Sequence, residues 1–233
     1  YQASTSGRAT VSQAAITDLA GFRFAQKIDV TTADTSIAAG EYFIINQMFE
    51  GFDVQRLQYG TSDAKTVTVS FYVKGTAKTY VAELVTQSSF TSQTFNVTTS
   101  WNRVSLTYPA NTADTLNQDN TNEFQLAIWL HAGCSLNSTW GTTSANRAVG
   151  IGSIFSSTDN ELFITGLQIE TGDVATPFEY ESFETNLARC QRYFYAPVPK
   201  GTTSSYFCDA WAYSSSLAAG WITHPVQMRT TPT

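Results

Sequence analysis

The stretch Gly166-Leu-Gln-Ile-Glu-Thr-Gly-Asp-Val-Ala-Thr-Pro-Phe-Glu-Tyr180 decides how the chain is divided. With the residues just before it, from Leu162 onward, it shows the two-residue alternation of a β-strand. Gly172 ends that strand, and Pro177 fixes its own φ at about −65° and favours an extended residue before it. Phe178 is placed to fold this exit back onto a sheet. We therefore expect one β-domain over residues 1–180 and a different structure over residues 181–233.

Short segments with strand periodicity recur through the first domain, separated by turn signals. In the clearest one, residues 65–74, Val67, Val69, Phe71 and Val73 share one face. This many short strands without a helical pattern predicts an all-β fold, a jelly-roll β-sandwich. The expected strands are residues 8–11, 22–30, 41–49, 65–74, 79–86, 94–99, 101–108, 123–131 and 161–169, with residues 54–59 as a further extended stretch.

After Tyr180 the apolar spacing becomes helical. Phe183, Leu187, Cys190 and Phe194 recur at intervals of four, three and four, and Ser182 is a suitable N-cap. The sandwich is thus followed by a short helix, and residues 206–213 and 221–229 predict a small C-terminal β segment. Two strands cannot bury enough surface alone, so they must be completed by the sandwich, by missing sequence or by another copy of the chain.

The composition argues against a nucleic-acid partner and against insertion into a membrane. The net charge of −6 and the pI near 4.8 argue against a nucleic-acid partner, and no apolar stretch approaches the roughly 20 residues of a membrane span.

The chain has three cysteines, Cys134, Cys190 and Cys208. Because their number is odd and their spacing is not that of metal ligands, we expect buried free thiols rather than disulfides. Because residue 1 is not Met, we expect the chain to be a piece of a longer polypeptide.

The sequence lacks the motifs of common catalytic sites and holds only two histidines, so we expect no enzyme activity. Sugar binding instead needs an aromatic ring beside amide or charged groups. The strand at residues 123–131 places Gln125, Trp129 and His131 opposite its core face, and these residues with Trp140 and Tyr72 are our glycan-binding candidates. The alternative is that Trp129 is covered by a loop or by a neighbouring subunit.

The order of several motifs resembles a known family. Tyr42-Phe-Ile-Ile-Asn-Gln-Met-Phe-Glu-Gly-Phe-Asp53, Thr66-Val-Thr-Val-Ser-Phe-Tyr-Val-Lys-Gly75, Ser100-Trp-Asn-Arg-Val-Ser-Leu106 and the opening stretch are similar to the carbohydrate-binding-module type of jelly roll in tailed-phage structural proteins. Leu187-Ala-Arg-Cys-Gln-Arg-Tyr-Phe194 and Met228-Arg-Thr-Thr-Pro-Thr233 resemble the segments that follow this module in phage tail-fibre and virion-associated proteins.

The resemblance implies a virion component, assembled in the cytoplasm of a bacterial host, that forms a homotrimer and contacts other virion proteins. Tail fibres, head fibres and capsid decorations all use such modules. No cofactor is expected except a structural calcium, which modules of this class often carry. Glu50, Asp53 and Glu170 could supply oxygen ligands for it.

Three hypotheses remain open from the sequence. The first is a non-enzymatic phage structural protein that mediates adhesion to a host-surface glycan or contacts within the virion. The second is a purely architectural capsid or tail decoration without a ligand. The third is a carbohydrate-binding module of a secreted polysaccharide-active enzyme, which the full-length sequence would reveal.

Overall fold

The chain divides into two units, Tyr1–Phe178 and Glu179–Thr233. The computed structural model describes residues 2–3, 5–133, 147–196, 210–221 and 223–231. Within these residues, the first unit is built from two five-stranded antiparallel sheets, and the second contains one α-helix and a β-hairpin. In the part of the chain that is described, no helix is long and apolar enough to cross a membrane.

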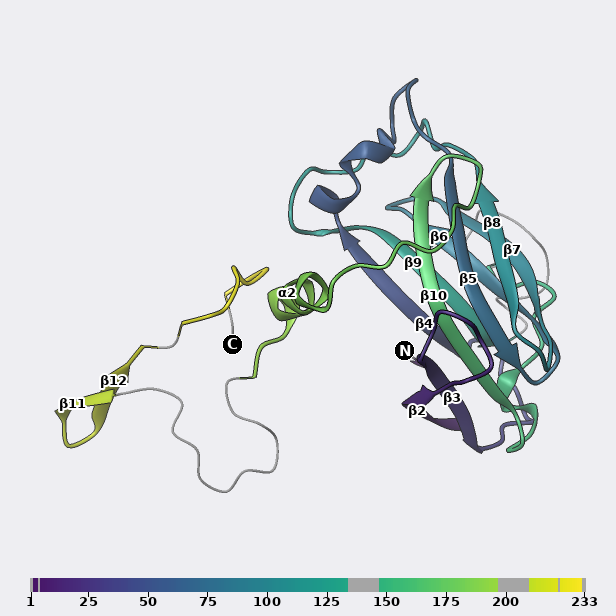
Figure 1. Cartoon of the computed structure of the whole chain (residues 1–233), viewed down its shortest axis with the longest axis horizontal. Helices are drawn as coiled ribbons and strands as arrows, with labels where there is room; N and C mark the ends of the chain where they lie inside the picture. The colour runs from purple at the N-terminus through teal and green to yellow at the C-terminus, as the bar shows by residue number, and fades with distance from the viewer. Residues whose placement is uncertain (1, 4, 134–146, 197–209, 222, 232–233) are drawn as a thin grey trace. The chain divides into compact units, whose positions relative to one another are not determined.

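Figure 1 labels the strands of the two sheets of the first unit, except β1. Sheet A has the order β1 (Gln2–Ala3), β4 (Tyr42–Glu50), β9 (Asn122–Ala132), β6 (Lys78–Val85) and β7 (Phe90–Val97). Sheet B has the order β2 (Arg8–Ala15), β3 (Phe24–Thr32), β10 (Glu161–Thr171), β5 (Val67–Gly75) and β8 (Asn102–Tyr108). Neighbours in sequence are often not neighbours in a sheet, as expected of a jelly roll. The predicted all-β jelly-roll class is confirmed.

The main core lies between the sheets. The predicted inward face of β5 is fully buried, and its Phe71 packs edge-on against Phe95 of β7 with ring centroids 5.1 Å apart. Each such side chain contributes about 1.5–3 kcal/mol when fully buried. The largest fully buried apolar side chains of the first unit are Tyr80, Tyr108, Phe71, Phe124, Phe155, Ile28, Leu126, Leu130, Ile154 and Leu162.

The exit turn folds back onto sheet B, as the sequence predicts. The Phe178 ring lies 5.2 Å from the Phe22 ring, and the Gly172 N–H donates to the Thr66 carbonyl at 2.7 Å. A bulge interrupts β10 between Thr165 and Gln168, where Gly166 has a φ of 60°. This left-handed conformation favours glycine, so the strict alternation expected through this strand is broken there.

Residues 54–59 do not form the extended stretch that the sequence predicts. Two 3-10 helices, η1 (Gly51–Asp53) and η2 (Gln55–Leu57), follow β4 instead. Val54 and Leu57 are both buried, and their spacing of three residues is that of a 3-10 turn. These two apolar residues therefore face the interior, but with a helical period and not that of a strand.

The second unit begins with helix α2 (Phe183–Tyr193), close to the predicted helix. Its N-cap is Ser182, whose hydroxyl accepts a hydrogen bond from the Thr185 N–H at 3.2 Å. The small β segment is the hairpin β11 (Ala210–Ser214) and β12 (Leu217–Gly220).

Two sequence predictions for the second unit are wrong. The strand predicted at residues 221–229 is absent from its described residues, because β11 pairs with the segment just before it through a tight local turn. The Cys190 thiol is free but exposed, whereas the sequence predicts a buried one. Cys134 and Cys208 lie outside the described residues.

Candidate functional site

A second apolar cluster lies on the outer face of sheet A, around Trp129 of β9. The Trp129 side chain is only 2% exposed, and its ring lies 5.8 Å from that of Tyr42. Ala148 and Ile151 pack into the same cluster from the segment that precedes β10. Trp129 is therefore on the predicted face, but a loop covers it, which was the alternative left open from the sequence.

A buried charge lies beside this cluster. Glu83 of β6 is fully buried and accepts hydrogen bonds from Trp129 Nε1 at 2.9 Å and from the Ser92 hydroxyl at 3.1 Å. Arg147 donates to the same carboxylate through Nε, at 2.9 and 3.0 Å, and through Nη2, at 2.6 Å. A buried carboxylate is tolerated only when it is paired and hydrogen-bonded, and Glu83 meets both conditions.

The Arg147 guanidinium also lies over two aromatic rings. Its central carbon is 4.1 Å from the Phe90 centroid and 5.0 Å from the Trp129 centroid. The planar guanidinium thus occupies the stacking position over Trp129 that a sugar ring would need. In this arrangement Trp129 is a structural residue, and a ligand would reach its ring only after Arg147 has moved.

His131 does not share the face of Trp129, so that sequence prediction is wrong. A bulge lies at this point of β9: Phe43 pairs with His131 while the next residue, Ile44, pairs with Trp129. The extra residue, Leu130, breaks the alternation and turns His131 inward. The His131 ring is fully buried and lies 5.3 Å from the core residue Phe155.

The remaining predicted glycan-binding residues are not gathered into one site. Gln125 is half-buried on β9, between Met48 and Val85 of the neighbouring strands. Tyr72 belongs to sheet B, where its ring lies 5.2 Å from that of Phe22. Trp140 lies outside the described residues. The part that these residues have in ligand binding stays a prediction.

The three carboxylates considered for calcium are not brought together. Glu50 ends β4 in sheet A, and Glu170 lies on β10 in sheet B, where it accepts a hydrogen bond from the Thr176 N–H at 3.1 Å. Among the described residues, the group of three ligating side chains found within 4.8 Å of one another is Asp34, Glu41 and His131. The calcium prediction therefore has no geometric support at Glu50, Asp53 and Glu170.

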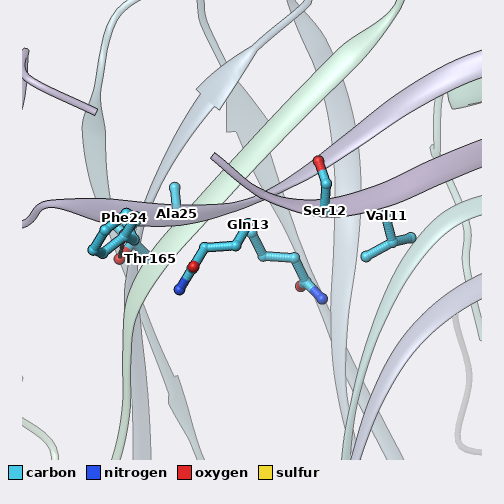
Figure 2. Close-up of a pocket in the computed structure, with 7 residues that line it drawn as sticks. Val11, Ser12, Gln13, Phe24, Ala25 and Thr165 are labelled. Atoms are coloured by element: carbon cyan, nitrogen blue, oxygen red, sulfur yellow. Dashed lines mark hydrogen bonds between the residues drawn. The ribbon is translucent and has the colours of Figure 1, made fainter. Parts of the chain in front are cut away.

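An open groove lies on β2 and β3 (Figure 2), with a volume of about 450 Å³. Phe24 and Gln26 share a strand face with Ile28 and Val30, which are buried in the core. Phe24 is nevertheless 51% exposed, so the inward face of β3 is open at its beginning. The groove is lined by Val11, Ser12, Gln13, Phe24, Ala25, Gln26 and Thr165.

The groove has the chemistry that sugar binding requires. Gln13 pairs with Gln26 across β2 and β3, and both amide side chains are exposed. Figure 2 shows Gln13 and Val11 on the opposite side of the strand from Ser12. The Phe24 ring offers an apolar surface, and the amides can both donate to and accept from hydroxyl groups.

Sequence reasoning missed both the Glu83 pair and the groove. A signal for Glu83 was present, because it is a charged residue inside the apolar run from Tyr80 to Val85. A weaker signal for the groove was Gln26, an amide on an otherwise apolar strand face. No signal identified Arg147 as the partner of Glu83, because the two are 64 residues apart.

Comparisons with known proteins give structural likenesses only. No family model matches the chain, and no curated protein matches it in sequence. A solved structure described as "CBM4 structure and function" is 13% identical, with 72% of this chain and 79% of that chain covered and a TM-score of 0.39. The family 11 carbohydrate-binding module of the cellulosomal cellulase Lic26A-Cel5E of Clostridium thermocellum is 11% identical, with coverages of 76% and 88% and a TM-score of 0.39.

A third likeness is the N-terminal cellulose-binding domain of β-1,4-glucanase C from Cellulomonas fimi. It is 14% identical, covers 65% of this chain and 80% of its own, and has a TM-score of 0.36. The solved structures that the sandwich resembles thus include carbohydrate-binding modules. Likenesses this distant carry no argument about a ligand, and the fold rests on the strand pairing described above.

Proposed function

We propose that this chain is a non-enzymatic structural protein of a tailed-phage virion that assembles through its second unit. Further copies of the same chain, in a homotrimer, and other virion proteins are the proposed partners. The virion setting and the number three follow from the motif resemblance described above. Assembly itself is supported by one structural observation, which is the exposure of large apolar side chains in the second unit.

Helix α2 has an apolar stripe but no buried residue. Phe183 is 77% exposed and Phe194, just after the helix, is 74% exposed. Leu187 lies between them on the same stripe and is also exposed. An amphipathic helix gains most of its stability from burying its apolar face, so this stripe requires a partner surface.

The β11–β12 hairpin and Trp221 also expose large apolar side chains. Trp211 of β11 lies 5.9 Å from Tyr213 and 6.5 Å from Trp221, measured between ring centroids, and Trp221 is 80% exposed. A two-stranded hairpin is marginally stable in water unless another surface covers it. Burying such a cluster between copies would provide the aromatic centre typical of protein interfaces.

The test is the mass in solution of the full chain and of matched variants. Trp211→Ser with Trp221→Ser should reduce the assembly to smaller species, because both rings would be lost from the interface. Val174→Ser is the control, since Val174 is also a large exposed apolar residue, at 69%, but belongs to the first unit. Equal masses for the double variant and the control would remove the proposed role of the hairpin.

A second proposed activity is adhesion to a host-surface glycan at the groove beside Phe24. Its support is the half-exposed Phe24 ring flanked by the amides of Gln13 and Gln26. A glycan array probed with the full chain would identify a bound sugar. Phe24→Ala and Gln26→Ala should each abolish or strongly weaken that binding.

The buried Trp129 provides the contrast in this experiment. A conservative Trp129→Phe change should leave binding at the groove intact, because Trp129 lies on sheet A and the groove lies on sheet B. Arg147 also covers the Trp129 ring. Binding that survives Phe24→Ala but is lost with Trp129→Phe would move the site to sheet A. No bound glycan for the wild-type chain would favour the purely architectural role.

A further inference from the structure

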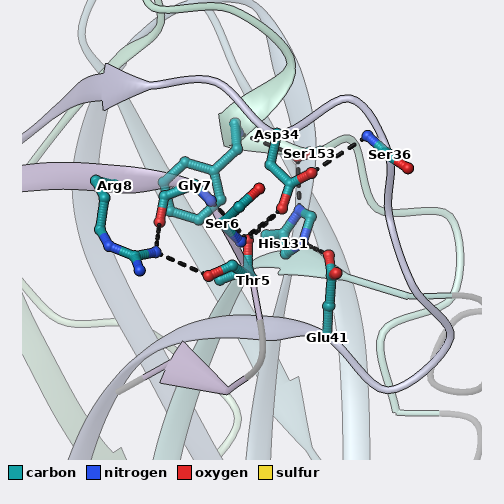
Figure 3. A network of polar contacts seen from close by, with 10 residues as sticks. Thr5, Ser6, Gly7, Arg8, Asp34, Ser36, Glu41, His131 and Ser153 are labelled. Atoms are coloured by element: carbon teal, nitrogen blue, oxygen red, sulfur yellow. Dashed lines mark hydrogen bonds and ion pairs between the residues drawn. The ribbon is translucent and has the colours of Figure 1, made fainter.

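Three buried ligating side chains meet in the first unit, at a place that the proposed function does not use (Figure 3). Asp34 lies in the connection between β3 and β4, Glu41 immediately precedes β4, and His131 is near the end of β9. One ligand atom from each lies within 4.8 Å of the others, and all three residues are buried. The cluster thus joins the connection between β3 and β4 to β9, which is distant from it in sequence.

The Asp34 carboxylate is held in place by hydrogen bonds. It accepts hydrogen bonds from the Thr5 hydroxyl and the Ser6 N–H, both at 2.8 Å, and from the Ser36 N–H at 3.2 Å. This carboxylate is therefore fixed in position inside the fold.

Glu41 is the least satisfied member of the cluster. Its side chain is 7% exposed, and Oε2 lies 3.4 Å from His131 Nε2. Within the described residues, the Glu41 carboxylate has no other hydrogen bond or ion pair. A buried carboxylate with a single long contact is costly unless a cation compensates it.

His131 is oriented in the way that metal ligands usually are. Its Nδ1 lies 2.7 Å from the Ser153 hydroxyl oxygen, which also accepts from the Phe155 N–H at 3.0 Å. When Nδ1–H donates to Ser153, the lone pair of Nε2 faces the carboxylates. A polar partner on one imidazole nitrogen that directs the other towards a site is typical of metal-binding histidines.

We propose that Asp34, Glu41 and His131 bind one divalent transition-metal ion, with zinc as the best-suited ion. Two carboxylates and one imidazole form a mixed oxygen and nitrogen donor set that suits zinc, whereas calcium needs six or more oxygens. Zinc ligands at about 2.0–2.2 Å from the ion lie about 3.4 Å apart in a tetrahedron, so ligand atoms that lie up to 4.8 Å apart need to close by up to about 1.4 Å. The bound ion would fasten Asp34, with the N-terminal residues Thr5 and Ser6, to β4 and β9.

The experiment uses the full chain after chelator treatment and dialysis, titrated with zinc chloride and, separately, with calcium chloride. We expect one zinc per chain and no calcium binding in the same concentration range. At a free zinc concentration 100 times the Kd, the melting temperature of the first unit should rise by about 5–10 °C. Cobalt bound in place of zinc should give the visible absorption of a four-coordinate, tetrahedral site.

Variants separate this site from other zinc-binding groups. Glu41→Gln keeps the shape of the side chain but removes a ligand, and should weaken zinc binding at least 10-fold without lowering the melting temperature of the metal-free chain. Glu123→Gln is the matched control, because Glu123 is also buried but is satisfied by Asn117, Thr121 and Gln87. It should bind zinc like the wild type.

Two results would overturn the proposal. The first is the absence of zinc binding to the wild-type chain at concentrations up to the millimolar range. The second is zinc binding that Glu41→Gln leaves unchanged and that Cys190→Ser removes, which would assign the metal to the exposed thiol of the second unit.

Discussion

Replacing Arg147 by alanine should destabilise the first unit more than any surface charge change. The substitution removes the only cation that the structure pairs with Glu83 in the described part of the chain, and it leaves that carboxylate fully buried. The Glu83 carboxylate would keep its hydrogen bonds from Trp129 and Ser92 but lose its counter-charge.

The magnitude follows from two contributions. Removing one partner of a buried ion pair costs about 3–5 kcal/mol, mostly because the remaining charge is uncompensated. The lost contact of the guanidinium with the Phe90 and Trp129 rings adds about 0.5–2 kcal/mol. The Arg147 side chain is 18% exposed, so water partly replaces the lost contacts and we expect about 4 kcal/mol in total. In a chain of this size that lowers the melting temperature by about 8–16 °C.

Urea unfolding monitored by tryptophan fluorescence measures this change, because Trp129 reports on the site directly. Arg189→Ala in the second unit is the matched control: its ion pair with Glu181 is 2.7 Å long, but the Arg189 side chain is 68% exposed. Exposed pairs contribute at most about 1 kcal/mol. A double change, Glu83→Leu with Arg147→Leu, should recover most of the loss. An Arg147→Ala cost below 1 kcal/mol, equal to that of the control, would refute the reasoning.

Two further predictions concern acid stability and the exit strand. Burial alone would raise the pKa of Asp114, but hydroxyl groups of Ser88 and Thr86 outweigh it and lower the pKa to about 2. Asp114 therefore stabilises the fold above its unfolded pKa of about 4, and this contribution is lost as the pH falls towards 2. The difference in unfolding free energy between wild type and Asp114→Asn should shrink between pH 4 and pH 2, and a constant difference would contradict the assignment. Gly166→Ala should cost about 1–3 kcal/mol in thermal unfolding, because a Cβ there would lie 2.7 Å from the Phe22 ring at a φ of 60°; an unchanged melting temperature would show that the bulge relaxes freely.

Strand periodicity predicted most of the sandwich because it records which side chains face the core. The alternation in β5 and β9 is a direct consequence of burial between two sheets, and both strands were located from it. Periodicity fails to predict the side on which a residue lies where a bulge adds one residue to a strand. The bulge at Leu130 reverses the side of His131, and nothing in the local sequence marks it.

The candidate sites were less predictable for a different reason. Alternation shows which face of a strand is turned inward, but it does not show how far the opposite sheet extends. Phe24 and Gln26 lie on the inward face of β3 and are still exposed. Similarly, Trp129 was correctly placed outside the main core, but only the three-dimensional structure shows that Arg147 covers it.

Pairings over long sequence distances account for the rest. Asp34 and His131 are 97 positions apart, and their meeting depends on the pairing of β4 with β9. The exit stretch is the opposite case: its partners Phe22 and Thr66 are also distant in sequence, but Gly172 and Pro177 set the turn through their own backbone. Its fold-back onto sheet B could therefore be predicted from the sequence.

The most direct test of the proposed assembly is the mass of the wild-type chain in solution, measured by light scattering over a range of concentrations. If the exposed faces of α2 and of the β11–β12 hairpin join copies of the chain, the mass should be about three times the 25.5 kDa of one chain. A mass of 25.5 kDa at every concentration would contradict the account.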